Sequence, residues 1–509
     1  MVWTTNEEGI PIKIIGGLPH GGDSAKILHA IMEEIKDFVA RWQEQLTVVP
    51  GECRRMEWEA LRLCTRIAGL IIALVLADRR VGEAAAHEGL QARPDRVRSP
   101  RPVKRRVLLP GGVKVQVQTP YCAPKMGRAA SGKRRQGEGA GVYPAFAALG
   151  IFEGKSPLAA DLLLRFALQM PSFETARQEL ETLGHPYDSK MPARTVRDFG
   201  KQALESRNAQ LAAWHRGELG PEKTLAGRRV VVSADGGRLR IRRKRKRARS
   251  GKRRKYIAEW REPKLITIYA LDERGRRDPE VKVQIDATMA GPDETMELLA
   301  FHLFRLGAGE ASVIEFIADG APWIWERIDK VIAWAGLDPK RCRKVLDIYH
   351  AYEHLGAALE ACGLVDREKK RQFSRLKNKL RVGKAGDMLL TLQGYLGRRR
   401  TKVHLLQKEI EYFRKRLPLL RYDEIKRKRL ALGSGAVESA IRRVINMRVK
   451  SPSMFWDEDT AEAMIHMRAQ LLSDRWDEMM DRIREHAKVS RRRIIAFTPT
   501  TCQPEAAAA

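Results

Sequence analysis

Five segments rich in β-branched residues, in one particular order, constrain the fold of this 509-residue chain more than any other feature. Residues 228–235, 264–272 and 281–289 follow one another with turn residues between them, which predicts an antiparallel meander. Residues 312–319 and 344–350 are each followed by a helical pattern. The order predicts an α/β fold in which a three-strand meander continues into a βαβα unit, giving a mixed sheet with helices on its faces.

Outside this region the periodicity predicts mainly helix. We expect a helical N-terminal domain (1–100), a strand-containing segment with a basic linker (101–142), a helical domain (143–225), the first part of the sheet-containing core (226–365), a basic helical insertion (366–432), the closing helices of the core (433–476), and a C-terminal helix with a disordered tail (477–509). Residues 172–206 fit a helix-turn-helix and an ordinary helical pair equally well.

The charge balance restricts the partners of the chain. With 95 Lys and Arg against 63 Asp and Glu, the net charge of +32 favours a polyanion, and nucleic acid is the first candidate. An acidic membrane would need a basic amphipathic helix or a lipid anchor, and the sequence shows neither. The longest apolar run, residues 67–77, has about half of the roughly 20 residues that a span needs, so we expect a buried helix there.

Two further features bear on location. The N-terminus carries neither the basic region nor the apolar region of a secretory signal, so we expect none. Six cysteines are scattered without paired spacing, which favours a reducing cytoplasm over a disulfide framework.

Three acids occupy positions suited to chemistry. Asp235 and Asp319 each end a predicted strand and precede glycine, and Glu438 lies early in a later helix. Carboxylates at strand ends lie where α/β sheets form binding crevices, and they are hard ligands suited to Mg²⁺ or Mn²⁺. Each acid also has an ordinary interpretation: Asp-Gly is a common turn dipeptide, and Glu438 could pair on the surface with Arg442 four residues on.

A dense basic run follows Asp235. Thirteen of the eighteen residues from 238 to 255 are Lys or Arg. They could form a solvated loop, but as a hairpin between the first two core strands they would lie beside Asp235 and contact DNA phosphates, which is the interpretation we favour. The expected contacts are Arg238, Arg240, Arg242, Arg243, Lys244, Arg245, Lys246, Arg247, Lys252, Arg253, Arg254 and Lys255.

The joint order of these features resembles a known family. The motifs are SADGG (233–237), FIADGAPWIWE (316–326), LDIYHAYEHL (346–355) and ALGSGAVESAIRRVINMRVKSPSMFW (431–456). Over about residues 143–476 the chain resembles the DDE-type bacterial insertion-sequence transposases, and within them the Kra-type group. The resemblance implies an RNase H-like catalytic core at 226–365 and 433–476, interrupted by the helical insertion.

Carried over position by position, the resemblance makes Asp235, Asp319 and Glu438 the metal-binding catalytic acids, with two Mg²⁺ or Mn²⁺ ions per site. It gives Asp347 and His350 a supporting role, either at the metal site or in orienting the scissile phosphate; both residues could equally cap a strand–helix junction. Arg442, Arg443, Arg448 and Trp456 are added to the expected DNA contacts, although Trp456 also fits a core position.

Related proteins often carry a Cys-x-x-Cys pair upstream, which suggests a zinc ribbon. Here Cys122 stands alone, with Lys125 three residues on, so we expect no zinc. His302, His354 and His404 have no spacing that would complete a metal cluster.

The implied activity is Mg²⁺-dependent strand cleavage at element ends, followed by attack of the freed 3′-OH on target DNA. The implied partners are double-stranded element ends and target DNA, no membrane, and at least a dimer on DNA, in a bacterial cytoplasm near the nucleoid. Two alternatives remain open: an RNase H-like nuclease without strand transfer, and a domesticated DNA-binding protein that has lost catalysis.

Overall fold

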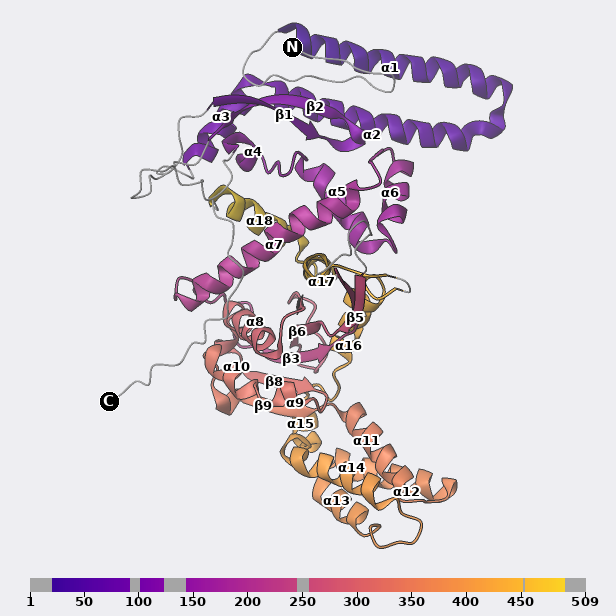
Figure 1. Cartoon of the computed structure of the whole chain (residues 1–509), viewed down its shortest axis with the longest axis vertical. Helices are drawn as coiled ribbons and strands as arrows, with labels where there is room; N and C mark the ends of the chain where they lie inside the picture. The colour runs from indigo at the N-terminus through magenta and orange to yellow at the C-terminus, as the bar shows by residue number, and fades with distance from the viewer. Residues whose placement is uncertain (1–20, 92–100, 123–142, 245–255, 452–453, 490–509) are drawn as a thin grey trace, which may run out of the picture. The chain divides into compact units, whose positions relative to one another are not determined.

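The computed structural model describes residues 21–91, 101–122, 143–244, 256–451 and 454–489. The chain forms two compact units, residues 209–476 in one, and residues 1–208 with 477–509 in the other. Helices cover most of the described chain, and one five-stranded sheet lies in the unit of residues 209–476 (Figure 1).

That sheet confirms the predicted α/β class and its mixed topology. Its strands are β3 (Arg229–Gly236), β6 (Lys264–Leu271), β7 (Gln284–Thr288), β8 (Val313–Ala318) and β9 (Cys342–Leu346), in the order β7-β6-β3-β8-β9. The meander strands β3, β6 and β7 pair antiparallel, whereas β8 and β9 add parallel to β3. The two halves of the sheet therefore differ in direction, as the strand order predicts.

Helices pack on both faces because alternate strand residues point to opposite sides. Val230 and Val232 of β3 belong to a core shared with α8 (Pro292–Arg305) and α10 (Ile328–Trp334). Val231, between them, belongs to a second core. The helices of that second core are α11 (Ile348–Ala361), α12 (Asp366–Arg381), α13 (Ala385–Gln393), α14 (Val403–Arg416) and α15 (Tyr422–Arg427). Residues 366–432 are thus helical, as predicted, and pack on α11.

The late helix changes geometry partway along its length. α16 (Gly435–Ile441) continues as a π-helical turn, Arg442–Asn446, and α17 (Glu458–Leu472) follows. The helical spacing of Val437, Ile441, Val444 and Met447 predicts a buried stripe, but Met447 is exposed and Ile445 is buried. The wider π turn holds more residues than an α turn and shifts the buried face, which is why the stripe expected from the sequence is wrong at this position.

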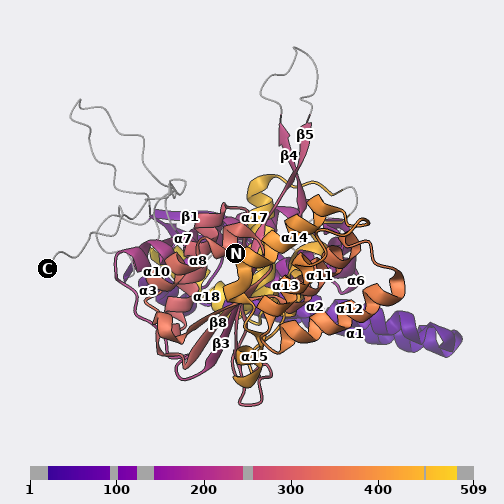
Figure 2. The same ribbon diagram turned by 90° about the horizontal axis from the view of Figure 1, so that it is seen from below.

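Two short strands form the arms of a hairpin after β3. β4 (Leu239–Lys244) pairs antiparallel with β5 (Tyr256–Arg261), and Figure 2 shows both arms projecting away from the sheet. Residues 245–255 lie outside the described residues. The expected DNA contacts among them are Arg245, Lys246, Arg247, Lys252, Arg253, Arg254 and Lys255.

The other unit is helical with one small sheet. Its elements are α1 (Gly21–Val48), α2 (Cys53–Ala77), α3 (Arg79–Gln91), β1 (Arg101–Leu108), β2 (Lys114–Tyr121), α4 (Pro144–Ala148), α5 (Pro157–Gln169) and α6 (Phe173–Thr182). α7 (Met191–His215) and α18 (Trp476–Val489) cross the unit boundaries. Residues 183–190 separate α6 from α7, a longer connection than the three or four residues of a typical helix-turn-helix.

The apolar run of α2 is less buried than we expected. Leu70 and Ala73 are buried, but Ile71 and Val75 on the other side of the helix are exposed, so the expectation of a buried helix is wrong for that face. By length and composition alone, Pro50–Ala77 is the one stretch of the described chain that could cross a membrane, and core helices of soluble proteins can meet the same criterion.

Candidate active site

Asp235 and Asp319 lie at the same edge of the sheet. Asp235 is the penultimate residue of β3, and Asp319 directly follows β8. The parallel register pairs Val232 with Phe316, and continuing it by three residues aligns Asp235 with Asp319. Parallel neighbours end at the same edge, so the sheet itself brings these two acids together.

Glu438 comes to this edge on α16, which packs against β3 and β6. The approach is close at Gly237, where an added Cβ would lie 2.6 Å from Cδ1 of Ile445. A side chain at residue 237 would therefore push the π-helical turn away from the strand end. The Gly-Gly pair after Asp235 has this packing role in addition to its turn propensity.

The electrostatics of Asp235 show that the acids share one environment. The pKa of Asp235 is raised to about 6, mainly by burial and to a smaller extent by the negative charges of Asp319 and Glu438. The Gly236 backbone N–H and the nearby His350 act in the opposite direction. A half-buried carboxyl near two others is a typical feature of catalytic acids, because proximity of like charges is costly without a function.

Each acid keeps one oxygen available. Oδ1 of Asp235 accepts a hydrogen bond from Gly236 N at 2.6 Å, and Oδ1 of Asp319 accepts one from Ala321 N at 2.9 Å. Oε1 of Glu438 lies 3.3 Å from Ser434 Oγ, whose single proton is shared with the closer Asp347 Oδ2. Within the described ranges their second oxygens accept no hydrogen bond, and Glu438 does not pair with Arg442.

Asp347 holds the segment that leads into α16. It is fully buried, and its Oδ1 accepts hydrogen bonds from Tyr349 N (2.6 Å) and His350 N (3.3 Å), capping α11. Its Oδ2 accepts from both the backbone N–H and the hydroxyl of Ser434. Since the Ser434 hydroxyl also lies near Glu438, Asp347 positions the third acid through Ser434, a residue that the sequence did not single out.

A second carboxyl, which is buried, binds the same segment that leads into α16. Glu315 of β8 is buried, its Oε2 accepts from Ala431 N at 2.9 Å, and burial raises its pKa to about 8. Glu315 and Asp347 thus fix residues 431–434 to β8 and α11. No sequence pattern marks Glu315, because its position within a buried strand predicts an apolar residue.

The helical insertion also reaches the site. Arg416 of α14 donates to Gly320 O, and an added Cβ at Gly320 would lie 2.4 Å from Oη of Tyr412. Tyr412 stacks on His354 with ring centres 3.5 Å apart, and burial raises its pKa to about 12 with a further contribution from Asp319. The insertion therefore packs directly against the turn that carries Asp319.

His350 lies beside the acids but has a local partner. Its Nδ1 is 3.4 Å from Glu353 Oε2, and its side chain is partly exposed. His350 also contributes to lowering the pKa of Asp235. The structure thus places His350 next to the site, while Asp347 lies behind it as a capping residue.

Two expected DNA contacts lie in the interior. Trp456 is 6% exposed, and its indole N–H donates to Val449 O at 2.9 Å. Arg448 is 1% exposed, with its guanidinium 5.4 Å from the Trp456 ring centre, and burial lowers its pKa to about 10. Neither side chain is on the surface where DNA could reach it. Arg240 and Arg242, by contrast, lie on the hairpin arms, and Arg442 is exposed on the π turn.

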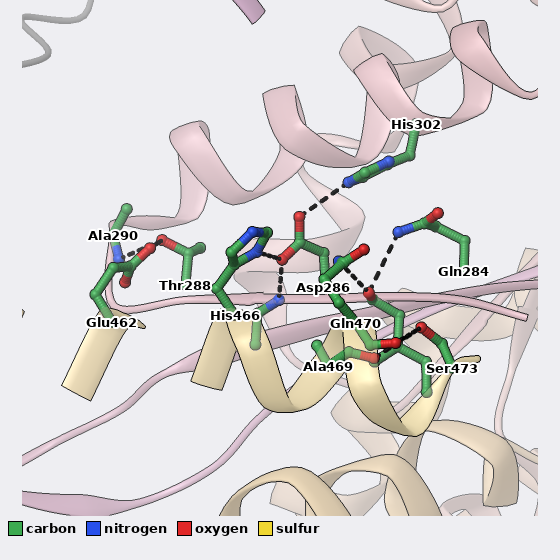
Figure 3. Close-up of polar contacts among 12 residues, drawn as sticks. Gln284, Asp286, Thr288, Ala290, His302, Glu462, His466, Ala469, Gln470 and Ser473 are labelled. Atoms are coloured by element: carbon green, nitrogen blue, oxygen red, sulfur yellow. Dashed lines mark hydrogen bonds and ion pairs between the residues drawn. The ribbon is translucent and has the colours of Figure 1, made fainter. Parts of the chain in front are cut away.

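A second polar group lies in the same unit (Figure 3). Asp286 of β7 is fully buried; its Oδ2 is 3.0 Å from His302 Nε2 and its Oδ1 is 2.8 Å from His466 Nδ1. Nearby, Glu462 of α17 accepts hydrogen bonds from Thr288 Oγ1 and Met289 N. The group ties α8 and α17 to the strand β7.

The donor types at the acidic site fit a hard divalent cation. Asp235, Asp319 and Glu438 offer carboxylate oxygens, which Mg²⁺ and Mn²⁺ prefer. Across the described part of the chain, no group of three or more His, Cys, Asp or Glu is already arranged to hold a metal ion. Cys122 is buried.

Comparison of the chain with family models, with curated proteins and with solved structures finds no match in any of the three.

Proposed function

We propose that the chain is a DNA transposase with an RNase H-like core, which cleaves DNA at element ends and joins the freed 3′-OH to target DNA. The observation that carries this proposal is the convergence of Asp235, Asp319 and Glu438 at one edge of the sheet. The three come from two neighbouring strand ends and a helix almost 120 residues further along the chain. A turn or surface role for each acid alone would not require them to meet.

In this proposal the three carboxylates hold Mg²⁺ or Mn²⁺, which would activate the attacking oxygen and stabilise the leaving one. Asp347 and Ser434 keep Glu438 oriented, and the Glu315 carboxyl keeps residues 431–434 against β8. The exposed arginines of β4 hold the DNA backbone near Asp235. The same site serves cleavage and joining, with water attacking in the first step and a 3′-OH in the second.

The net charge of +32 supports a substrate of several DNA segments. Two element ends and a target present more phosphates than a single duplex. We expect the chain to act as a dimer or higher oligomer on DNA, because paired ends must be brought together.

The test uses labelled DNA that carries the inverted repeats flanking the coding region, a target plasmid and Mg²⁺. Strand-transfer products are expected from the wild-type chain and not from Asp319→Ala. Glu310→Gln is a matched control, because Glu310 is an exposed acid at the opposite end of β8. Cleavage without joining would indicate the nuclease instead. DNA binding without cleavage, unaltered by Asp319→Ala, would indicate a catalytically silent protein.

A further inference from the structure

The arms of the β4–β5 hairpin have two faces of different character. In the antiparallel register Arg240 lies opposite Trp260, and Ile241 lies opposite Glu259. Because side chains alternate along each strand, residues of like chemistry gather on each side. One face carries Arg240, Arg242, Tyr256 and Trp260; the other carries Leu239, Ile241, Arg243, Glu259 and Arg261.

The second of these faces is already satisfied within the protein. Leu239 and Ile241 are fully buried. Arg243 pairs with Glu259 at 3.1 Å and with Glu458 at 3.0 Å, and Arg261 also pairs with Glu458 at 3.0 Å. Two arginines and two glutamates balance one another, so this face anchors the hairpin and has little charge left for a partner.

The first face combines cations and aromatic rings without acids. The Arg240 guanidinium lies 4.6 Å from the ring centre of Trp260, and that of Arg242 lies 4.8 Å from the ring centre of Tyr256. Phe455 contacts both, at 5.7 and 5.1 Å. In the part of the chain that the structure describes, neither arginine forms an ion pair. Trp260 is 53% and Tyr256 50% exposed, an unusual cost for large rings.

This aromatic–arginine face (Arg240, Arg242, Tyr256, Trp260 and Phe455) lies on the hairpin that begins directly after Asp235. Gly237 N donates to Pro263 O at 2.8 Å, closing the base of the hairpin directly after Asp235. The backbone of Trp456 bonds to β4 on both sides, through Arg240 O at 3.1 Å and Arg242 N at 2.7 Å. These bonds hold Phe455 against the arginines, so the face is a built surface on the hairpin that leaves the end of β3.

We propose that the aromatic–arginine face binds unpaired DNA bases next to the phosphodiester that is cut. Exposed rings stack on base faces, while guanidinium groups held against the rings keep their N–H donors available for phosphates. Paired bases within a duplex hide their faces, so a surface that contacted only duplex backbone would gain nothing from exposed Trp260 and Tyr256. The inference rests on the proposed DNA substrate, but it requires no catalysis.

The test measures binding by the full chain without divalent metal, so that cleavage plays no part. Fluorescein-labelled DNA is used as a fully paired duplex and as the same duplex with a short unpaired end. Trp260→Ala is expected to raise the Kd for the unpaired-end DNA by about fivefold or more, and the Kd for the duplex by less than about twofold. Trp334→Ala, at an exposed tryptophan of α10, should change neither value.

A second measurement covers the case in which Trp260→Ala disturbs the hairpin. 2-Aminopurine placed in the unpaired end should lose fluorescence on binding to the wild type and to Trp260→Phe, but not to Trp260→Ala. Equal weakening on both DNAs, or unchanged 2-aminopurine fluorescence with the wild type, would overturn the proposal. Discrimination by a chain that never cleaves DNA would sustain this face and overturn the transposase function instead.

Discussion

Two groups of polar side chains in the sheet-containing unit place carboxylates in opposite environments: Asp286 is fully buried, whereas Asp235 and Asp319 are half-buried and Glu438 is exposed. At the Asp286 group, one carboxylate meets two histidines, and each of its oxygens has a partner at 3.0 Å or less. At the acidic site, Asp235, Asp319 and Glu438 come to one edge of the sheet, and among the described residues one oxygen of each accepts no hydrogen bond.

The difference separates structural from functional use of the same chemistry. A buried acid matched by hydrogen-bond donors holds elements together. Acids gathered without a cation destabilise the fold by repulsion, and this arrangement persists where a ligand brings the missing positive charge. Substitutions in the Asp286 group should therefore lower the stability of the fold, whereas substitutions at the acidic site should lower activity.

The largest effect should come from neutralising the acidic site. Asp319→Asn should reduce DNA cleavage by roughly 10³-fold or more, because a ligand to the catalytic cation is lost. Its thermal stability should stay near the wild-type value, since repulsion with Asp235 is relieved. Cleavage rates and melting temperatures are measured together, with Glu310→Gln as control. A variant that cleaves normally would remove Asp319 from the site.

The Asp286 group should behave in the reverse way. Asp286→Ala leaves His302 and His466 without their shared acceptor in the interior, so the free energy of unfolding should fall by about 3 kcal/mol. Chemical denaturation measures the change. Asp329→Ala, which breaks an exposed ion pair with Lys344, should cost less than about 1 kcal/mol. Lost cleavage with unchanged stability would mean that the Asp286 group takes part in catalysis.

The buried carboxyl of Glu315 should make the stability of the protein depend on pH. Its pKa is raised to about 8, above the ordinary value of 4.5, so the folded chain keeps a proton that the unfolded chain releases. The resulting stability is present below the unfolded pKa and is lost as pH rises through about 8. Glu315→Gln should remove this loss, gaining on the order of 4 kcal/mol relative to the wild type between about pH 5 and about pH 9. Chemical denaturation of the wild type and of Glu315→Gln at both pH values measures the change. An equal difference in stability between the two proteins at pH 5 and at pH 9 would contradict a raised pKa at Glu315.

The smallest expected effect on activity comes from the residue that positions Glu438. Ser434→Ala removes the hydroxyl between Asp347 and Glu438 while keeping the backbone N–H bond to Asp347. We expect kcat for cleavage to fall about tenfold, the equivalent of ~1.4 kcal/mol, with little change in the Kd for DNA. Ser434→Thr should restore much of the rate. A fall in DNA affinity rather than in kcat would indicate a contact with DNA instead.

Much of the sheet could be predicted because its signals are local. Runs of β-branched residues and the turns between them predict the antiparallel meander and the two parallel strands that follow it. The observed strand order agrees with that prediction. β1 was missed because Pro102 and four basic residues hide its strand pattern, and it is a strand only through its pairing with β2. The exposed side of α2 was missed for a similar reason: hydropathy reports composition and not which face has a neighbour.

The candidate site, too, was predictable only in the features that depend on local sequence. The sequence by itself determined which acids end strands, where the positive charge is concentrated, and the order in which these features follow one another. Only the tertiary structure decided that Asp347 and Glu315 serve as supports, that Arg448 and Trp456 are interior residues, and that Trp260 and Tyr256 are exposed with their rings against Arg240 and Arg242. The physical reason is range: strand and helix patterns depend on neighbours a few residues away, whereas burial, hydrogen-bond partners and shared charge depend on segments that only folding brings into contact.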